Sequence, residues 1–192
     1  MGVEISKAQA TQMTRLREGR VVLSPSYKQL VKEHGEGKVL GNVLDYGAGR
    51  CEEAAWFEHE HNHIIETYEP FPVDGVRPDY VRAMQIPDGR FQYVVCSYVL
   101  NVLPADSRLQ VLRNIEKALV KGGTLLLSYR RTLSNENKEW PKYEDGYIKP
   151  NAQFQAEITD AKIGWMMANM RHLVANAVVH KGANGFAHIT KT

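Results

Sequence analysis

The chain has 192 residues, enough for one domain with a sizeable hydrophobic core, and its fractions of apolar (43%) and charged (24%) residues are those of an ordinary globular protein. A formal net charge of +2 is too small by itself to indicate nucleic acid or a membrane surface as a partner. The absence of any run of about 18 apolar residues excludes a transmembrane helix, and two cysteines with no signal-peptide core at the N-terminus predict a cytoplasmic protein.

The first part of the chain is predicted to be helical. A polar, basic helix is expected over residues 7–20, and Ser26 is expected to cap a second helix over residues 27–34. We interpret residues 1–36 as an N-terminal helical extension that covers the functional site, and residues 37–192 as the domain that contains this site.

From residue 38 onward, strand-like and helix-like segments alternate. Predicted strands lie at residues 38–46, 62–68, 79–83, 91–97 and 124–129, and predicted helices at 52–60, 105–121 and 160–170. This alternation predicts an α/β fold with a doubly wound, mostly parallel sheet and helices on both faces. Two further apolar runs, 173–180 and 186–190, flank a glycine-rich turn and predict a C-terminal antiparallel hairpin that brings the sheet to seven strands.

Two segments are predicted to be loops. Pro70, Pro72 and Gly75 predict a loop over residues 71–77, where folds of this kind often have a helix. Residues 130–151 are polar and contain two prolines and a glycine, which predicts a long loop or lid.

The stretch from residue 43 to residue 53 carries the strongest functional signal. An apolar, strand-like run leads into an acid, Asp45, and two glycines, Gly47 and Gly49, and a helix follows. Glycine has no Cβ, so this turn lets the backbone approach a ligand that lies beyond the strand, next to the helix N-terminus. A dinucleotide site has a third glycine where Glu52 stands, and a carboxylate there repels a diphosphate. The pattern therefore favours a cofactor without phosphate groups.

The motif Val43-Leu44-Asp45-Tyr46-Gly47-Ala48-Gly49 resembles the first motif of class I S-adenosylmethionine-dependent methyltransferases. The similarity continues through residues 91–97, 100–104 and 122–127 and through the terminal hairpin. It implies a Rossmann-like fold, S-adenosyl-L-methionine as the cofactor and methyltransferase activity. By this resemblance the cofactor-binding residues are Asp45, Gly47, Gly49, Glu69, Met84 and Ser97, with Glu69 on the ribose hydroxyls.

Two positions depart from the pattern of this family. Cys51 stands where the usual turn has its third glycine, and no acid follows the third predicted strand to bind the adenine amino group. The adenine is therefore expected to lie against the backbone near Met84. A narrower resemblance, carried by residues 44–50, 68–71, 98–102 and 154–155, is to the DNA phosphorothioation-associated methyltransferases.

Residues after the fourth predicted strand bear on the methyl acceptor. The Asn/Asp-Pro-Pro-Tyr motif of amino methylation is absent there, and Cys96 follows valine rather than the proline of cytosine C5 methylation. Tyr98, Asn101 and Arg130 are predicted to orient the acceptor. Ser97, Tyr129 and Arg131 are expected on the same rim. The acceptor itself stays open between a small molecule and a nucleic-acid component.

Other functions are compatible with the same motifs. The chain is alternatively a non-catalytic S-adenosylmethionine-binding sensor or partner subunit, or an enzyme that degrades this cofactor. His59, His61 and His63 alternate with glutamates but are expected in a solvated loop opposite the site, so no metal centre is predicted.

Overall fold

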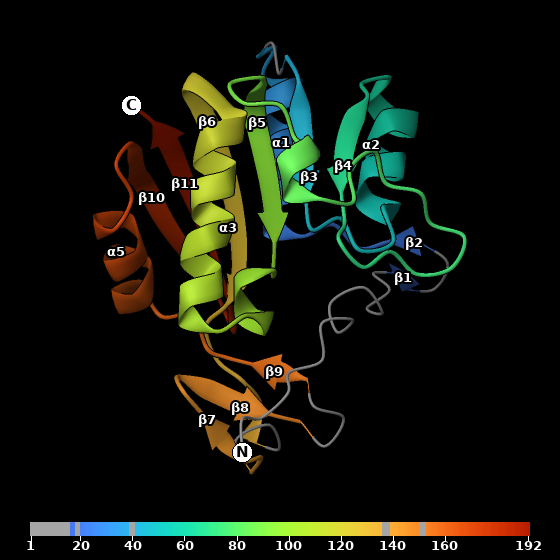
Figure 1. The fold of residues 1–192 in the computed structure, drawn as a ribbon. Coiled ribbons are helices and arrows are strands. Elements are labelled where there is room, and N and C mark those ends of the chain that lie inside the picture. The colour runs from blue at the N-terminus through green and yellow to red at the C-terminus, as the bar shows by residue number, and fades with distance from the viewer. Residues whose placement is uncertain (1–15, 18–19, 39–40, 136–138, 150–152) are drawn as a thin grey trace.

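A six-stranded sheet forms the centre of the molecule in the computed structural model, which describes residues 16–17, 20–38, 41–135, 139–149 and 153–192 (Figure 1). The order of its strands is β10-β11-β6-β5-β3-β4. The parallel strands are β3 (Val43–Tyr46), β4 (Ile65–Tyr68), β5 (Phe91–Ser97) and β6 (Leu119–Arg130). The antiparallel strands are β10 (Leu173–Lys181) and β11 (Asn184–Lys191). The predicted doubly wound, mostly parallel sheet with a C-terminal hairpin is confirmed.

Helices cover both faces of the sheet. α1 (Pro25–Gly35) and α2 (Glu52–His61) bury Tyr27, Leu30 and Phe57 against one face. α3 (Ala105–Ala118) and α5 (Asp160–Ala168) bury the leucines and isoleucines of their helical stripes against the other face (Figure 1). Each such fully buried side chain contributes roughly 1.5–3 kcal/mol. Two short 3-10 helices, η2 (Ala83–Gln85) and η3 (Leu100–Val102), follow strand ends.

A second, three-stranded sheet lies beyond the carboxyl ends of the parallel strands (Figure 1). It consists of β7 (Lys142–Tyr143), β8 (Gly146–Ile148) and β9 (Phe154–Gln155). The predicted lid over residues 130–151 therefore contains regular structure, although residues 136–138 and 150–151 lie outside the described residues.

The N-terminal segment differs from the prediction. Leu16–Arg17 and Arg20–Val21 form two short antiparallel strands, β1 and β2, instead of the end of a helix, and residues 7–15 of that predicted helix lie outside the described residues. The cap of α1 is Ser24 rather than Ser26, because Pro25 already occupies the first helical turn and the Ser24 hydroxyl accepts from the backbone N–H of Tyr27.

Two element boundaries also differ. α3 ends at Ala118 and the chain enters β6 directly, so the double glycine at 122–123 lies in the irregular start of this strand rather than after the helix. The predicted strand over residues 79–83 is reduced to a single bridge between Tyr68 and Tyr80, so the described residues form six central strands instead of seven. The Asp79 carboxylate takes the place of a ladder partner, because it accepts from the backbone N–H of Thr67 at 2.7 Å.

Candidate functional site

The turn between β3 and α2 has the backbone geometry that its glycines predict. The N–H groups of Gly47 and Ala48 both donate to the carbonyl oxygen of Tyr68, at 2.8 and 3.0 Å. Gly47 and Gly49 have φ angles of +81° and +60°. A Cβ on Gly47 would lie 2.4 Å from Cγ2 of Val99, whereas nothing lies within 4 Å of the Cβ position of Gly49. The turn therefore needs glycine at position 47 for packing against Val99. At position 49 the glycine exposes its backbone to open space.

Cys51 adopts a backbone conformation that favours glycine. Its φ angle is +57°, in the left-handed region, and it is the N-cap residue of α2 without a side-chain capping bond. Burial raises the pKa of the Cys51 thiol to about 11, so the thiol stays protonated near neutral pH. This argues against Cys51 as a nucleophile.

A cavity of about 370 Å³ opens beside this turn. It is lined by Val22, Leu23, Ser24, Asp45, Gly47, Ala48, Gly49, Arg50, Glu52, Glu53, Ser97, Tyr98, Val99, Asn101, Val102, Arg130, Gln155 and Asn184. Seven residues predicted for the site meet there. They are Asp45, Gly47, Gly49, Ser97, Tyr98, Asn101 and Arg130.

The other two predicted cofactor residues do not line this cavity. Glu69 is 3% exposed, and its carboxylate accepts from the backbone N–H groups of Gly49, at 2.9 Å, and Phe71, at 3.0 Å. Burial raises the pKa of Glu69. Met84 lies in η2 and is 86% exposed. Two further residues are expected on the rim. Tyr129 is fully buried in the core cluster on the side of the sheet that α3 and α5 cover. Arg131 lies near Asp160, with 3.8 Å between the Arg131 Nε and the Asp160 Oδ1.

Sequence reasoning missed several lining residues. Val22, Leu23 and Ser24 come from the segment before α1, and Glu53 comes from the first turn of α2. Asn184 begins β11. An acid in the first turn of the helix after the glycines was the only signal that pointed to Glu53, whereas the N-terminal residues and Asn184 reach the cavity through long-range packing alone.

A cluster of serine hydroxyls joins α1 to the strand ends beside the cavity. Oγ of Ser97 lies 2.7 Å from Oγ of Ser26 and 3.0 Å from Oγ of Ser24. Oγ of Ser128 lies 2.8 Å from Oγ of Ser26 and accepts from its backbone N–H at the same distance. The predicted cofactor residue Ser97 is therefore engaged with α1.

Asn101 donates both of its amide hydrogens to main-chain carbonyl oxygens. Its Nδ2 donates to the carbonyl oxygens of Arg130, at 2.8 Å, and Ala156, at 2.7 Å, while its Oδ1 accepts from the N–H of Arg130 at 2.8 Å. The side chain is buried, and the contacts tie the end of β6 to β9. In this geometry Asn101 positions Arg130 and retains no amide hydrogen for an acceptor.

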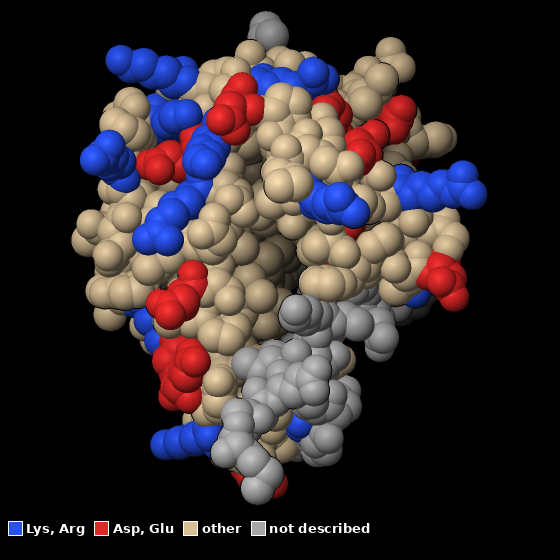
Figure 2. Space-filling view, viewed as in Figure 1, with Lys and Arg blue, Asp and Glu red and all other residues tan. Residues whose placement is uncertain are grey.

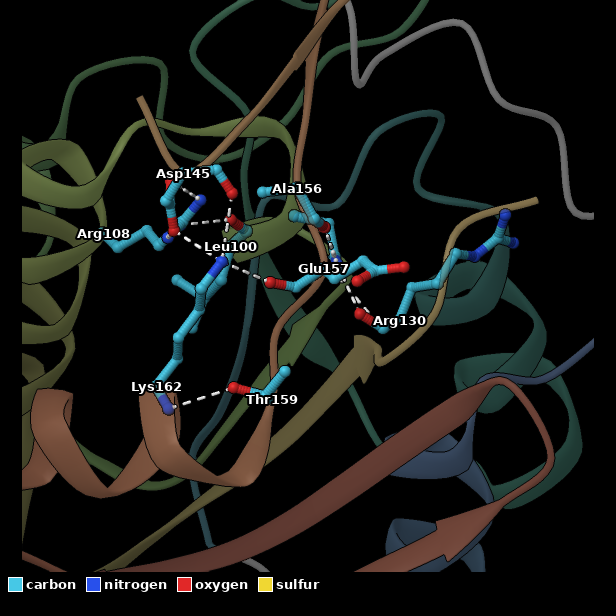
Figure 3. A network of polar contacts seen from close by, with 9 residues as sticks. Leu100, Arg108, Arg130, Asp145, Ala156, Glu157, Thr159 and Lys162 are labelled. Carbon is cyan, nitrogen blue, oxygen red and sulfur yellow. Dashed lines mark hydrogen bonds and ion pairs between the residues drawn. The ribbon is translucent and has the colours of Figure 1, made fainter. Parts of the chain in front are cut away.

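Tyr98 and Arg130 are the other two predicted acceptor residues, and both line the cavity. Tyr98 has a φ angle of +62°, which costs a non-glycine residue about 1 kcal/mol and is characteristic of functional sites. The Arg130 side chain extends away from the contacts made by its own backbone (Figure 3). Its guanidinium has no hydrogen-bond or ion-pair partner among the described residues.

A buried ionic contact fastens the small sheet to the body of the molecule (Figure 3). Arg108 of α3 donates from Nη1 and Nη2 to the carboxylate of Asp145, at 2.5 and 3.0 Å, and from Nε to the carbonyl oxygen of Leu100. Nζ of Lys162 lies 2.6 Å from the same carboxylate and donates to the carbonyl oxygen of Glu157. Asp145 is in the turn between β7 and β8, so this latch holds the wall that carries Gln155.

The fold and the cavity define a class of protein: a doubly wound α/β enzyme of the class I methyltransferase type, with its site at the carboxyl ends of the parallel strands. The chain belongs to the family described as "Methyltransferase domain", whose model matches residues 16–170. The predicted class of enzyme, with S-adenosylmethionine as its cofactor, is confirmed.

Solved structures share this fold. A Burkholderia thailandensis 1,6-didemethyltoxoflavin-N1-methyltransferase has a TM-score of 0.67 at 17% identity, over 97% of this chain and 80% of that one. An S-adenosylmethionine-dependent methyltransferase from Archaeoglobus fulgidus has a TM-score of 0.58 at 13% identity, over 86% and 92% of the two chains. One from Mesorhizobium loti has a TM-score of 0.56 at 10% identity, over 85% and 97%.

No curated protein matches the chain. The narrower resemblance to the phosphorothioation-associated group stays a prediction. Within the described residues, no helix has both the length and the apolar character needed to cross a membrane.

Proposed function

We propose that this protein transfers the methyl group of S-adenosylmethionine to a small anionic acceptor bound by Arg130. The observation that carries the proposal is Arg130, a residue that lines the cavity and whose guanidinium has no hydrogen-bond or ion-pair partner among the described residues. Its backbone is held on both sides by Asn101. A guanidinium on a residue that lines a partly enclosed cavity favours a carboxylate or phosphate, which it binds through two parallel hydrogen bonds.

The residues around the glycine turn fit this cofactor. Asp45 and Glu53 line the cavity where the cationic methionine part belongs, and the backbone of Gly49 faces open space. We assign the ribose hydroxyls to Glu69, because each of its carboxylate oxygens accepts one main-chain N–H and retains capacity for another hydrogen bond. The adenine then lies toward Met84.

Methyl transfer needs little more than correct placement of the acceptor. The cofactor supplies a methyl group on a positively charged sulfur: a lone pair of the acceptor bonds to the methyl carbon while the carbon–sulfur bond breaks and its electron pair stays on sulfur. Arg130 holds the anionic group of the acceptor, Asn101 keeps the backbone of Arg130 in place, and Tyr98, which also lines the cavity, orients the acceptor.

Two observations favour a small molecule over a nucleic acid. On the face drawn in Figure 2, basic and acidic side chains of the described residues are interspersed and form no extended basic surface, which a duplex requires. The similar Burkholderia enzyme is described with bound 1,6-didemethyltoxoflavin and S-adenosylhomocysteine, a small acceptor and a demethylated cofactor.

We also propose that residues 1–36 form an extension that covers the site and that residues 130–151 act as its lid. Val22, Leu23 and Ser24 of the extension line the cavity. Within the lid, Asp145 ties the small sheet to α3 and α5.

Methyl-labelled S-adenosylmethionine, incubated with the purified protein and a cell extract, tests the proposal. We expect label in the anionic small-molecule fraction, and at least about tenfold less with Arg130→Met, since a charged hydrogen-bonded contact contributes about 1.5–3 kcal/mol. Arg113→Gln, on the exposed side of α3, is the matched control and should transfer label normally.

Each other outcome identifies a rival function. Label in nucleic acid contradicts the small-molecule acceptor. Label that stays on the cofactor indicates a binding protein or partner subunit, and labelled breakdown products without an acceptor indicate a cofactor-degrading enzyme.

A further inference from the structure

The start of α1 carries hydrogen-bond donors that reach two carboxylates of the cavity. The hydroxyl of Tyr27 donates to Oδ2 of Asp45 at 2.8 Å. The backbone N–H of Ser24 donates to Oε1 of Glu53 at 2.5 Å. Asp45 is the last residue but one of β3, and Glu53 lies in the first turn of α2, so the two carboxylates come from either side of the glycine turn. Both line the cavity.

Burial fixes these donors. The side chain of Tyr27 is fully buried, and its ring packs on Phe57 of α2 with the ring centroids 6.3 Å apart. Burial, followed by the charges of Asp45 and Glu53, raises the pKa of Tyr27 well above its ordinary value. The hydroxyl therefore keeps its proton and acts as a donor to the carboxylate of Asp45.

The carboxylates of Asp45 and Glu53, each fixed by a hydrogen bond from the start of α1, are suited to bind a cation. Asp45 and Glu53 are only 3% and 7% exposed, so a group that meets them there is largely shielded from water. The methionine part of S-adenosylmethionine carries an ammonium group, and ammonium–carboxylate hydrogen bonds are about twice as strong as neutral ones.

The family resemblance already assigns Asp45 to the cofactor. We propose that Glu53 joins it as a second carboxylate for the ammonium group of the cofactor, and that Tyr27 is the positioning residue of this two-carboxylate receptor. The inference rests on the function proposed above. It adds Glu53 as a cofactor-binding residue and makes α1, which precedes the first strand of the domain, a constituent of the cofactor site.

Calorimetry with two ligands tests the role of Glu53. S-adenosylhomocysteine carries the ammonium group, whereas 5′-methylthioadenosine keeps the adenosine and the sulfur but lacks the amino and carboxyl groups. Glu53→Gln is expected to weaken binding of the first ligand about tenfold and to change binding of the second by less than about twofold. Glu58→Gln, on the exposed side of α2, is the control and should leave both affinities unchanged.

A second pair of variants tests the role of Tyr27. Tyr27→Phe keeps the buried ring and should weaken S-adenosylhomocysteine binding about fivefold, because Asp45 loses a hydrogen bond. In an Asp45→Asn background the same substitution should add almost nothing, because the hydroxyl no longer faces a charge. Tyr93→Phe is the matched control: its hydroxyl also donates to a buried carboxylate, that of Glu33 at 2.5 Å, but neither residue lines the cavity. Thermal unfolding without ligand measures the folding of each variant separately.

The outcomes distinguish this inference from the proposed function. If the unchanged protein fails to bind S-adenosylhomocysteine, both are overturned. If it binds, but Glu53→Gln and Tyr27→Phe leave its affinity unchanged or weaken both ligands equally, the receptor is overturned and the proposed function stands. Equal effects of Tyr27→Phe and Tyr93→Phe contradict the positioning role of Tyr27.

Discussion

Replacing Asp145 by asparagine should release the small sheet from the body of the protein. The Arg108 side chain is 3% exposed and its carboxylate partner 30% exposed, so the substitution leaves a buried guanidinium without an anionic partner. Its remaining acceptors are the carbonyl oxygen of Leu100 and the single amide oxygen of the new side chain. Removing one partner of a buried ion pair costs about 3–5 kcal/mol, and the partial exposure of Asp145 places the expected loss near the lower end, about 3 kcal/mol. For a chain of this size that lowers Tm by about 6–12 °C.

The pH dependence of this loss provides an independent check. Burial alone would raise the pKa of Asp145, but hydrogen bonds from Arg108 and Lys162 outweigh it and hold the pKa below its ordinary value of 3.8. The stabilisation is therefore fully present above pH 3.8 and is lost as the pH falls through the lowered pKa of the folded state. The difference in stability between the unchanged protein and Asp145→Asn should narrow over that acidic range.

Urea unfolding followed by circular dichroism measures this difference, with Asp74→Asn in the exposed 71–77 loop as the control. A difference of less than about 0.5 kcal/mol at pH 7, the size expected for an ordinary surface substitution, would refute the reasoning. In that case the ion pair of Arg108 with Asp145 contributes nothing measurable to the free energy of unfolding. The small sheet is then held by other contacts, such as those of Asn101 and Phe154.

The glycine turn supports three further predictions, all measurable by urea unfolding and by calorimetry with S-adenosylhomocysteine. Cys51→Gly should stabilise the fold by about 0.5–1 kcal/mol, because glycine adopts the observed φ of +57° without strain, and an unchanged or lower stability would contradict this account of the altered turn. Gly47→Ala should destabilise by at least about 2 kcal/mol, since its Cβ meets Val99 in addition to the strain of a positive φ. Gly49→Ala should lower the free energy of unfolding by only about 1 kcal/mol, and its main effect should be weaker ligand binding. If Gly47→Ala and Gly49→Ala are equally stable, the contact with Val99 is unimportant.

The sequence by itself determined the class of fold and the place of the site. Alternating apolar segments recur at strand and helix spacing, and this local pattern alone predicts a parallel sheet with helices on both faces. A strand, an acid and two glycines likewise place a ligand at one particular turn, because the left-handed backbone at Gly47 and Gly49 is a conformation that glycine favours whatever its neighbours are. The family resemblance then identified the cofactor.

Only the tertiary structure decided which side chains meet in the cavity. Tyr27 and Ser24 are distant in sequence from Asp45 and Glu53, the carboxylates that they contact in the fold. Nothing in their local sequence distinguishes them from ordinary residues at the start of a helix. Asn101 carries a side chain suited to an acceptor, yet folding commits both of its amide hydrogens to the main chain around Arg130. Hydrogen-bond partners of this kind depend on how α1, β6 and the small sheet pack together, and no local pattern encodes that packing.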